Sequence, residues 1–293
     1  MLLERELYDD AVNELRFAQR MWGSSSAIEA TIAWAHNKQG QLETGAKRFT
    51  LIRGSINTMR RAYPQFMAAG GEELPREILS VIYPLAYWDL VRKYSSEREL
   101  DPYLVAALVL QESTFVPDIK SYANAVGLMQ LMPFTARQVA GKIGIRYTPT
   151  LSTNPEANIR MGTAYFADKM REFGDVHLAL ASYNAGERPV HAWVAQKPGI
   201  PRDEFIEDIP YTQTQNYVKW ILGSADDYRR LYGGLARAEE LTPAARLASV
   251  AQGVGAAPAK TAPAAKAPTT TKGSAKKPLA KKPASATSGK PSE

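Results

Sequence analysis

A run of nine residues without a charge, 103–111, constrains the fold of this 293-residue chain more than any other stretch. Asp101 and Pro102 before the run are typical of a helix start, because aspartate caps the helix and proline fits its first position. Thr114 after the run predicts where the helix ends. The pattern therefore predicts a buried helix with Glu112 in its last turn.

Glu112 is an unexpected residue at the end of so apolar a helix. Apolar neighbours remove water from its carboxylate, and the helix C-terminus carries a partial negative charge, so both effects raise the expected pKa of Glu112. A glutamate that stays protonated near neutral pH is suited to general-acid catalysis. The alternative is a surface glutamate that happens to follow a buried run.

Several classes of site and location are disfavoured by composition. The chain has no cysteine, which excludes disulfides, thiolate–zinc sites and a cysteine nucleophile. Its three histidines (His36, His177 and His191) are scattered, so we expect neither a metal nor another cofactor. The chain contains no stretch of 18 uncharged apolar residues, so no transmembrane segment is expected. The first residues lack the basic start and apolar core of a signal peptide, so either the protein stays in the cytosol or the chain lacks its true beginning.

The chain divides into three regions by composition. Residues 1–83 carry apolar residues at helical spacing, punctuated by glycines, which predicts stacked helical hairpins. Residues 84–232 hold most of the unusual local sequence, with a second helix start at Asn154-Pro155 and a stretch without helical period, 121–130, expected to be a loop or a short strand. Residues 233–293 are rich in Ala, Pro, Lys, Ser and Thr and contain no aromatic residue, which predicts a disordered tail.

The basic character of the chain is located in this tail. Its net charge is +6, while the eight lysines and one glutamate from residue 251 onward contribute +7, so the remainder is near −1. Without aromatic residues the tail lacks base-stacking platforms, and no nucleic-acid partner is expected. The tail is either a solvated linker or a segment that adheres to anionic envelope polymers or a membrane surface.

Four motifs follow one another in the second region. They are YPLAYWDLV (83–91) with QES (111–113), SYANAVGLMQLMP (121–133), ALASYNAG (179–186) and FIEDIPYTQTQNYVKW (205–220). Gly127 permits a close backbone approach or a turn with positive φ. Gln130 and Asn184 can each donate and accept hydrogen bonds, which suits sugar hydroxyl and acetamido groups. The alternative for the GLMQ stretch is a tight turn between helices with ordinary core methionines.

Taken together, these motifs resemble those of the soluble lytic transglycosylases, bacterial enzymes that cleave peptidoglycan. The resemblance covers about residues 84–232 and implies a mainly α fold, with a lysozyme-like α+β catalytic domain preceded by α-helical hairpins that are a remnant of a longer superhelix. It also implies a periplasmic or cell-envelope location, with export information absent from this chain. We expect the protein to be a monomer that binds peptidoglycan glycan strands.

The resemblance also assigns roles to individual residues. Glu112 matches the single catalytic acid/base, and Tyr183 matches a tyrosine that lies close to the catalytic carboxyl. The remaining residues expected to bind substrate are Ser121, Gly127, Met129, Gln130, Met132, Asn184 and Glu207. One departure is that Glu187 follows the SYNAG motif where proline is usual, which leaves the shape of that loop open.

The implied reaction cleaves the β-1,4 bond between N-acetylmuramic acid and N-acetylglucosamine without water and leaves 1,6-anhydromuramyl ends. A first alternative is a lysozyme-type hydrolase, for which Glu207 is the only second acid that the motifs offer. Two others are a catalytically inactive wall-binding protein and a helical-repeat adaptor.

Overall fold

The structure is a computed structural model that describes residues 1–233, and the expected disordered tail lies outside this range. The N-terminal elements are η1 (Leu3–Arg5), α1 (Tyr8–Trp22), α2 (Ser26–Leu42), α3 (Gly45–Ala62), η2 (Pro64–Met67), η3 (Gly71–Glu73) and α4 (Arg76–Ile82). The later elements are α5 (Trp88–Ser96), α6 (Pro102–Ser113), α7 (Pro133–Lys142), η4 (Pro149–Ser152), α8 (Pro155–Phe173), α9 (Val176–Ala185), α10 (Glu187–Gln196), α11 (Arg202–Glu207) and α12 (Thr212–Tyr232).

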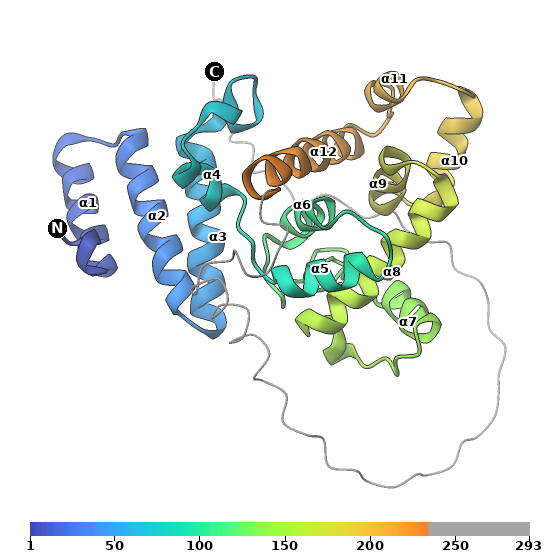
Figure 1. Ribbon diagram of the computed structural model, residues 1–293, viewed down its shortest axis with the longest axis horizontal. Helices are drawn as coiled ribbons and strands as arrows, with labels where there is room; N and C mark the ends of the chain where they lie inside the picture. Colours follow the sequence, from blue (N-terminus) through green and yellow to red (C-terminus); the bar gives the residue numbers. More distant parts are fainter. Residues whose placement is uncertain (234–293) are drawn as a thin grey trace, which may run out of the picture.

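The expected helical hairpins are confirmed at the N-terminal end. Helices α1, α2 and α3 lie side by side, with α2 packed between the other two (Figure 1). Ile32 and Ala35 of α2 are buried against Tyr8 and Val12 of α1, as their helical spacing predicts. Ser25 caps the start of α2, because its hydroxyl accepts a hydrogen bond from the Ile28 N–H at 3.3 Å.

Helix α6 is the central helix of the second half, and α12 packs along it (Figure 1). All seven residues from Leu104 to Leu110 are buried, which explains why the segment carries no charge. Helix α5 packs against α6, α9 packs against α12, and α8 packs against α5, α7 and α9, so α8 joins the remaining helices to the pair of α6 and α12.

The fold is mainly helical, as expected, but the β component of the expectation is not shown. In the part of the chain that the structure describes, the stretch predicted as loop or short strand forms only isolated bridges, Lys120 with Val126 and Val126 with Leu131. Positive φ angles at Asn124 and Gln130, of 67° and 45°, turn the backbone too often for a ladder to extend.

A single hydrophobic core crosses the boundary expected at residue 83. It runs from Ile56 of α3 through Tyr83 to Tyr228 of α12. Tyrosine hydroxyls join α12 to main-chain carbonyls before α5: Tyr228 donates to Pro84 and Tyr232 to Tyr83, each at 2.9 Å. The packing therefore shows no break at residue 83, and the division into a hairpin region and a catalytic domain stays a prediction.

No helix within residues 1–233 combines the length and the apolar character needed to cross a bilayer.

Candidate active site

The last turn of α6 places Glu112 at the edge of the core. Asp101 caps the helix by accepting a hydrogen bond from the Tyr103 N–H at 2.9 Å, as its sequence position predicts. Glu112 is half-buried, between exposed Gln111 and buried Ser113. The side chain therefore reaches the surface from a helix that is otherwise buried.

The helix ends in an uncommon backbone conformation. Thr114 and Phe115 both have left-handed φ angles, of 52° and 59°, which cost on the order of 1–3 kcal/mol each for residues other than glycine. Burial of the Phe115 ring, which is 2% exposed, offsets part of this cost. The strained turn directs the chain away from Glu112 immediately after its helix.

Tyr217 of α12 holds the carboxylate of Glu112. Its hydroxyl donates a hydrogen bond to Oε1 of Glu112 at 2.7 Å, and its side chain is buried. Burial and then the negative charge of Glu112 raise the pKa of Tyr217 well above its ordinary value, so the phenol stays neutral and remains a donor.

Tyr217 was not singled out in the sequence, although it lies within the fourth motif. One signal was available: Thr214, Tyr217, Val218 and Ile221 form a buried face of α12 at helical spacing. That spacing predicts that Tyr217 is buried while Tyr211 is exposed. It does not reveal that Tyr217 bonds to Glu112, which lies 105 residues earlier in the chain.

Tyr183 interacts electrostatically with this pair. Burial and then the negative charge of Glu112 raise the pKa of Tyr183 well above its ordinary value. Its hydroxyl donates to the Met129 carbonyl at 2.7 Å and so joins α9 to the GLMQ loop. The single proton of this hydroxyl is thus already donated, so a hydrogen bond between Tyr183 and Glu112 would have the protonated carboxyl as its donor, and that bond stays a prediction.

Gly127 is required by the close approach of Asn158 from α8. Gly127 has a φ of 87°, and a Cβ there would lie 2.1 Å from the Ser152 carbonyl oxygen and 2.3 Å from Nδ2 of Asn158. The fully buried Asn158 accepts from the Met129 N–H at 2.8 Å and donates to the carbonyls of Ser152 and Val126 at 2.8 and 3.1 Å. Sequence reasoning missed Asn158, since a lone helical asparagine gives no sign of such a role.

The GLMQ residues support the shape of their own loop. Nε2 of the buried Gln130 donates to the carbonyls of Gly127 at 2.8 Å and Ile119 at 3.1 Å. Met129 is fully buried against Gly162 of α8, where a Cβ would lie 2.2 Å from its sulfur. The alternative interpretation, a tight turn with core methionine, therefore describes Met129 well.

The other expected substrate-binding residues are placed as follows. The Ser121 hydroxyl accepts from the Ala125 N–H at 3.0 Å, and Met132 is half-buried immediately before α7. Asn184 accepts a hydrogen bond from the Thr214 hydroxyl at 2.8 Å. Glu207 is exposed and pairs with Lys219 at 2.7 Å. Direct contact of these residues with a sugar stays a prediction.

Within residues 1–233, no group of three or more His, Cys, Asp or Glu side chains is arranged to hold a metal ion. The titratable groups that the structure brings together at this site are Glu112 and the buried tyrosines Tyr183 and Tyr217. One carboxyl that can both give and take a proton is suited to acid/base catalysis at a single centre.

Comparison with known families matches residues 89–206 to the transglycosylase SLT domain. The soluble lytic murein transglycosylase of Escherichia coli (strain K12) is 37% identical over 156 residues, covering 52% of this chain and 24% of the relative. A transglycosylase of Enterobacteria phage PRD1 is 35% identical over 117 residues, covering 40% of this chain and 41% of the phage protein. The chain thus spans about a quarter of the length of the Escherichia coli relative.

Solved structures show the same fold. The 70 kDa soluble lytic transglycosylase of Escherichia coli superposes with a TM-score of 0.53 at 26% identity, over 82% of this chain and 46% of that chain. A lytic transglycosylase of Pseudomonas aeruginosa superposes with a TM-score of 0.55 at 24% identity, over 77% of this chain and 37% of that chain. Residues 89–206 therefore match a transglycosylase SLT domain, and the described part of the chain has the fold of the soluble lytic transglycosylases.

Proposed function

We propose that this protein is a lytic transglycosylase that cleaves the β-1,4 bond between N-acetylmuramic acid and N-acetylglucosamine in peptidoglycan and leaves 1,6-anhydromuramyl ends. The hydrogen bond from Tyr217 to Glu112, inside a cluster of buried tyrosines, is the observation that carries the proposal. The SLT domain and the names of the relatives support the substrate class.

Glu112 acts first as the general acid. It transfers its proton to the glycosidic oxygen as the bond from C1 to that oxygen breaks, and positive charge develops at the muramyl ring. Tyr217 stabilises the carboxylate that forms on Glu112, because its hydroxyl already points at Oε1.

Glu112 then acts as the general base. It takes the proton of the muramyl C6 hydroxyl, whose oxygen bonds to C1 and closes the 1,6-anhydro ring. Water is not consumed and Glu112 ends protonated, ready for another cycle. A second carboxylate, as in most glycoside hydrolases, is not needed on this route.

The second acid offered by the sequence is better explained by another role. Glu207 lies at the exposed end of α11, and its carboxylate pairs with Lys219 of α12. An exposed, ion-paired carboxylate is poorly suited to activate a water molecule as a base, which supports the non-hydrolytic route over a lysozyme-type hydrolase.

The GLMQ loop and the Tyr183–Asn184 turn form the walls of the proposed site. Gly127, Met129 and Gln130 set the backbone of the loop through Asn158 and Gly162, and this backbone together with Ser121, Met132, Asn184 and Glu207 contacts the glycan strand. The protein acts as a monomer in the periplasm or cell envelope, where its substrate is.

Replacement of Glu112 by Gln tests the catalytic assignment. The variant keeps the shape and a hydrogen-bond acceptor for Tyr217, so we expect a folded protein that releases no product from purified sacculi. Mass spectrometry of the wild-type products is expected to give anhydro ends. Mainly reducing ends, together with loss of activity in a Glu207→Gln variant, would instead assign a hydrolase.

A further inference from the structure

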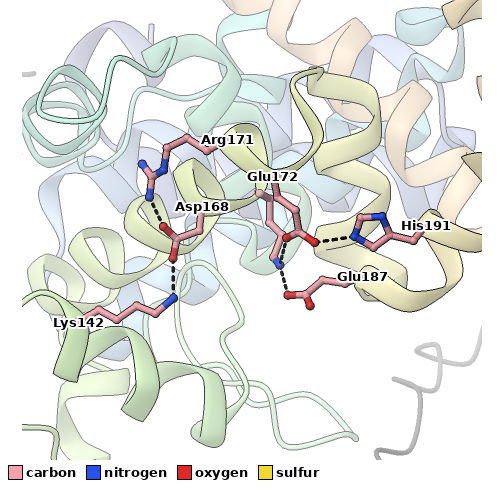
Figure 2. Close-up of polar contacts among 7 residues, drawn as sticks. Lys142, Asp168, Arg171, Glu172, Glu187 and His191 are labelled. Carbon is pink, nitrogen blue, oxygen red and sulfur yellow. Dashed lines mark hydrogen bonds and ion pairs between the residues drawn. The ribbon is translucent and has the colours of Figure 1, made fainter.

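A buried lysine of α8, Lys169, lies one helical turn after Tyr165, whose ring contacts Tyr183 of the proposed site. The side chain of Lys169 on α8 is only 4% exposed, and its Nζ donates to Glu172 at 2.8 Å and to Glu187 (Figure 2). Burial would lower the pKa of Lys169, but its hydrogen bonds to the two carboxylates outweigh this effect and raise the pKa. The lysine therefore stays charged, and its charge is compensated within the protein.

The two carboxylates come from different elements. Glu172 extends from α8 itself and also lies 2.8 Å from Nε2 of His191 on α10. Glu187 is the first residue of α10, directly after the Tyr183–Gly186 turn, which is the last turn of α9 with its cap Gly186. Lys169 thus ties α8 to the point where α10 begins (Figure 2).

The same ammonium group faces an aromatic ring that leads to the proposed acid. Nζ of Lys169 lies 5.2 Å from the centroid of the Tyr165 ring, within the range of a cation–π contact. The Tyr165 ring is tilted against the Tyr183 ring, with centroids 5.2 Å apart. Tyr183 in turn lies within electrostatic reach of Glu112.

We propose that Lys169, clamped by Glu172 and Glu187, is a positioning residue that fixes Tyr165 and the Tyr183–Gly186 turn around Glu112. The proposal rests on the proposed function, because it assigns Lys169 a role in the same site. The proposal also assigns a role to Glu187, because its ion pair with Lys169 fixes the start of α10 at the position where the family usually has a proline.

The expected effect of losing the clamp is a displacement of the turn. A methionine at position 169 keeps the apolar stem but leaves both carboxylates without their cation and Tyr165 without its charged neighbour. A misplacement on the order of 1 Å far from the chemistry can lower a rate by about 100-fold. We therefore expect a loss in kcat/KM of about 10- to 100-fold.

Three variants test the proposal. Lys169→Met removes the cation, and Glu187→Gln removes one exposed partner while leaving Glu172 in place, so it remains informative if Lys169→Met fails to fold. Lys142→Met is the matched control, because Lys142 of α7 is also paired with a carboxylate of α8, Asp168 at 3.3 Å, but its side chain is 69% exposed (Figure 2).

Two measurements are made on each full-length variant. Product release from sacculi gives kcat/KM, and hydrogen–deuterium exchange by mass spectrometry reports on the backbone of residues 183–187. We expect Lys169→Met and Glu187→Gln to lower kcat/KM and to speed exchange in residues 183–187 but not in α7, whereas Lys142→Met changes neither quantity.

A general loss of stability would speed exchange in α7 as well, and that result refutes a positioning role. Kinetics and exchange equal to those of the wild type in a folded Lys169→Met or Glu187→Gln variant also refute it. An inactive wild-type protein refutes the proposed function and, with it, a catalytic effect of Lys169. The exchange measurement then separately supports or refutes the structural tie to the turn.

Discussion

Removing the hydroxyl of Tyr217 is the most direct test of how Glu112 is controlled. Tyr217→Phe deletes a hydrogen bond of 2.7 Å to a half-buried carboxylate and leaves the buried ring in place. A hydrogen bond to a charged group contributes about 1.5–3 kcal/mol. If that bond forms fully as Glu112 gives up its proton, its loss slows the reaction by about 10- to 150-fold, at about 1.36 kcal/mol for each factor of ten.

The same substitution moves the pH profile in a defined direction. The Tyr217 hydroxyl favours the ionised carboxylate, which opposes the effect of burial, so its removal raises the pKa of Glu112. General-acid catalysis requires protonated Glu112, and the alkaline limb of the pH–rate profile therefore moves to higher pH in Tyr217→Phe.

The assay is the release of soluble muropeptides from sacculi at a series of pH values, with Tyr228→Phe as the control. Tyr228 is also a buried tyrosine of α12, but its hydroxyl donates to the Pro84 carbonyl. An unchanged rate in Tyr217→Phe, or an alkaline limb that moves to lower pH, would refute the reasoning. A shift of equal size in Tyr228→Phe would attribute the effect to α12 in general.

Three further predictions concern stability and binding. Gly127→Ala is expected to lower the free energy of unfolding by about 3 kcal/mol or more, because alanine is strained at this φ and its Cβ clashes with Ser152 and Asn158. The control Gly54→Ala, on the open face of α3, is expected to raise the free energy of unfolding by about 0.5–1 kcal/mol. Urea denaturation compares the two variants, and equal values would contradict the close approach of Asn158 to Gly127. A shortened chain of residues 84–233 lacks Tyr83 and other core side chains, and burial of each contributes about 1.5–3 kcal/mol to stability. Calorimetry should therefore show a melting temperature at least about 10 °C lower than that of the whole chain. An unchanged melting temperature would mean that the hairpins are not needed for stability. The proposed function extends to this protein the ligand of the 70 kDa lytic transglycosylase, whose structure was solved in complex with bulgecin A. Bulgecin A is therefore expected to raise the melting temperature of this protein, since a ligand at 100 times its Kd adds about 2.7 kcal/mol, and no shift at saturating concentration would count against that extension.

Local chemistry made the helix of Glu112 predictable. Asp101 and Pro102 mark its start, an uncharged stretch marks its burial, and the helix ends at Ser113, so Glu112 lies in the last turn as expected. The start at Asn154-Pro155 is confirmed for the same reason, with Asn154 capping α8. Such signals depend on residues within one or two turns, which a single sequence contains in full.

Contacts between distant parts of the chain could not be read in this way. The partners Tyr217 and Glu112 are 105 residues apart, and Asn158 meets the Met129 N–H across 29 residues. Nothing near either residue specifies its partner, because the approach of α12 to α6 and of α8 to the loop depends on packing of the whole core. Tyr183 shows the intermediate case: the resemblance predicts a place near Glu112, but it gave no sign of the hydrogen bond from Tyr183 to the Met129 carbonyl.

The tyrosine bonds from α12 to the segment before α5 have a consequence for how the protein can change over evolution. Tyr228 and Tyr232 donate to peptide carbonyls of Pro84 and Tyr83, and every residue type at an acceptor position supplies such a carbonyl. Substitutions in the acceptor segment that keep its backbone path would therefore leave these bonds intact, whereas loss of either hydroxyl removes one outright. These two bonds therefore fix the residue type on the donor side only, and on the acceptor side the residue type is limited by packing in the core, as for the buried Tyr83, and not by the hydrogen bond.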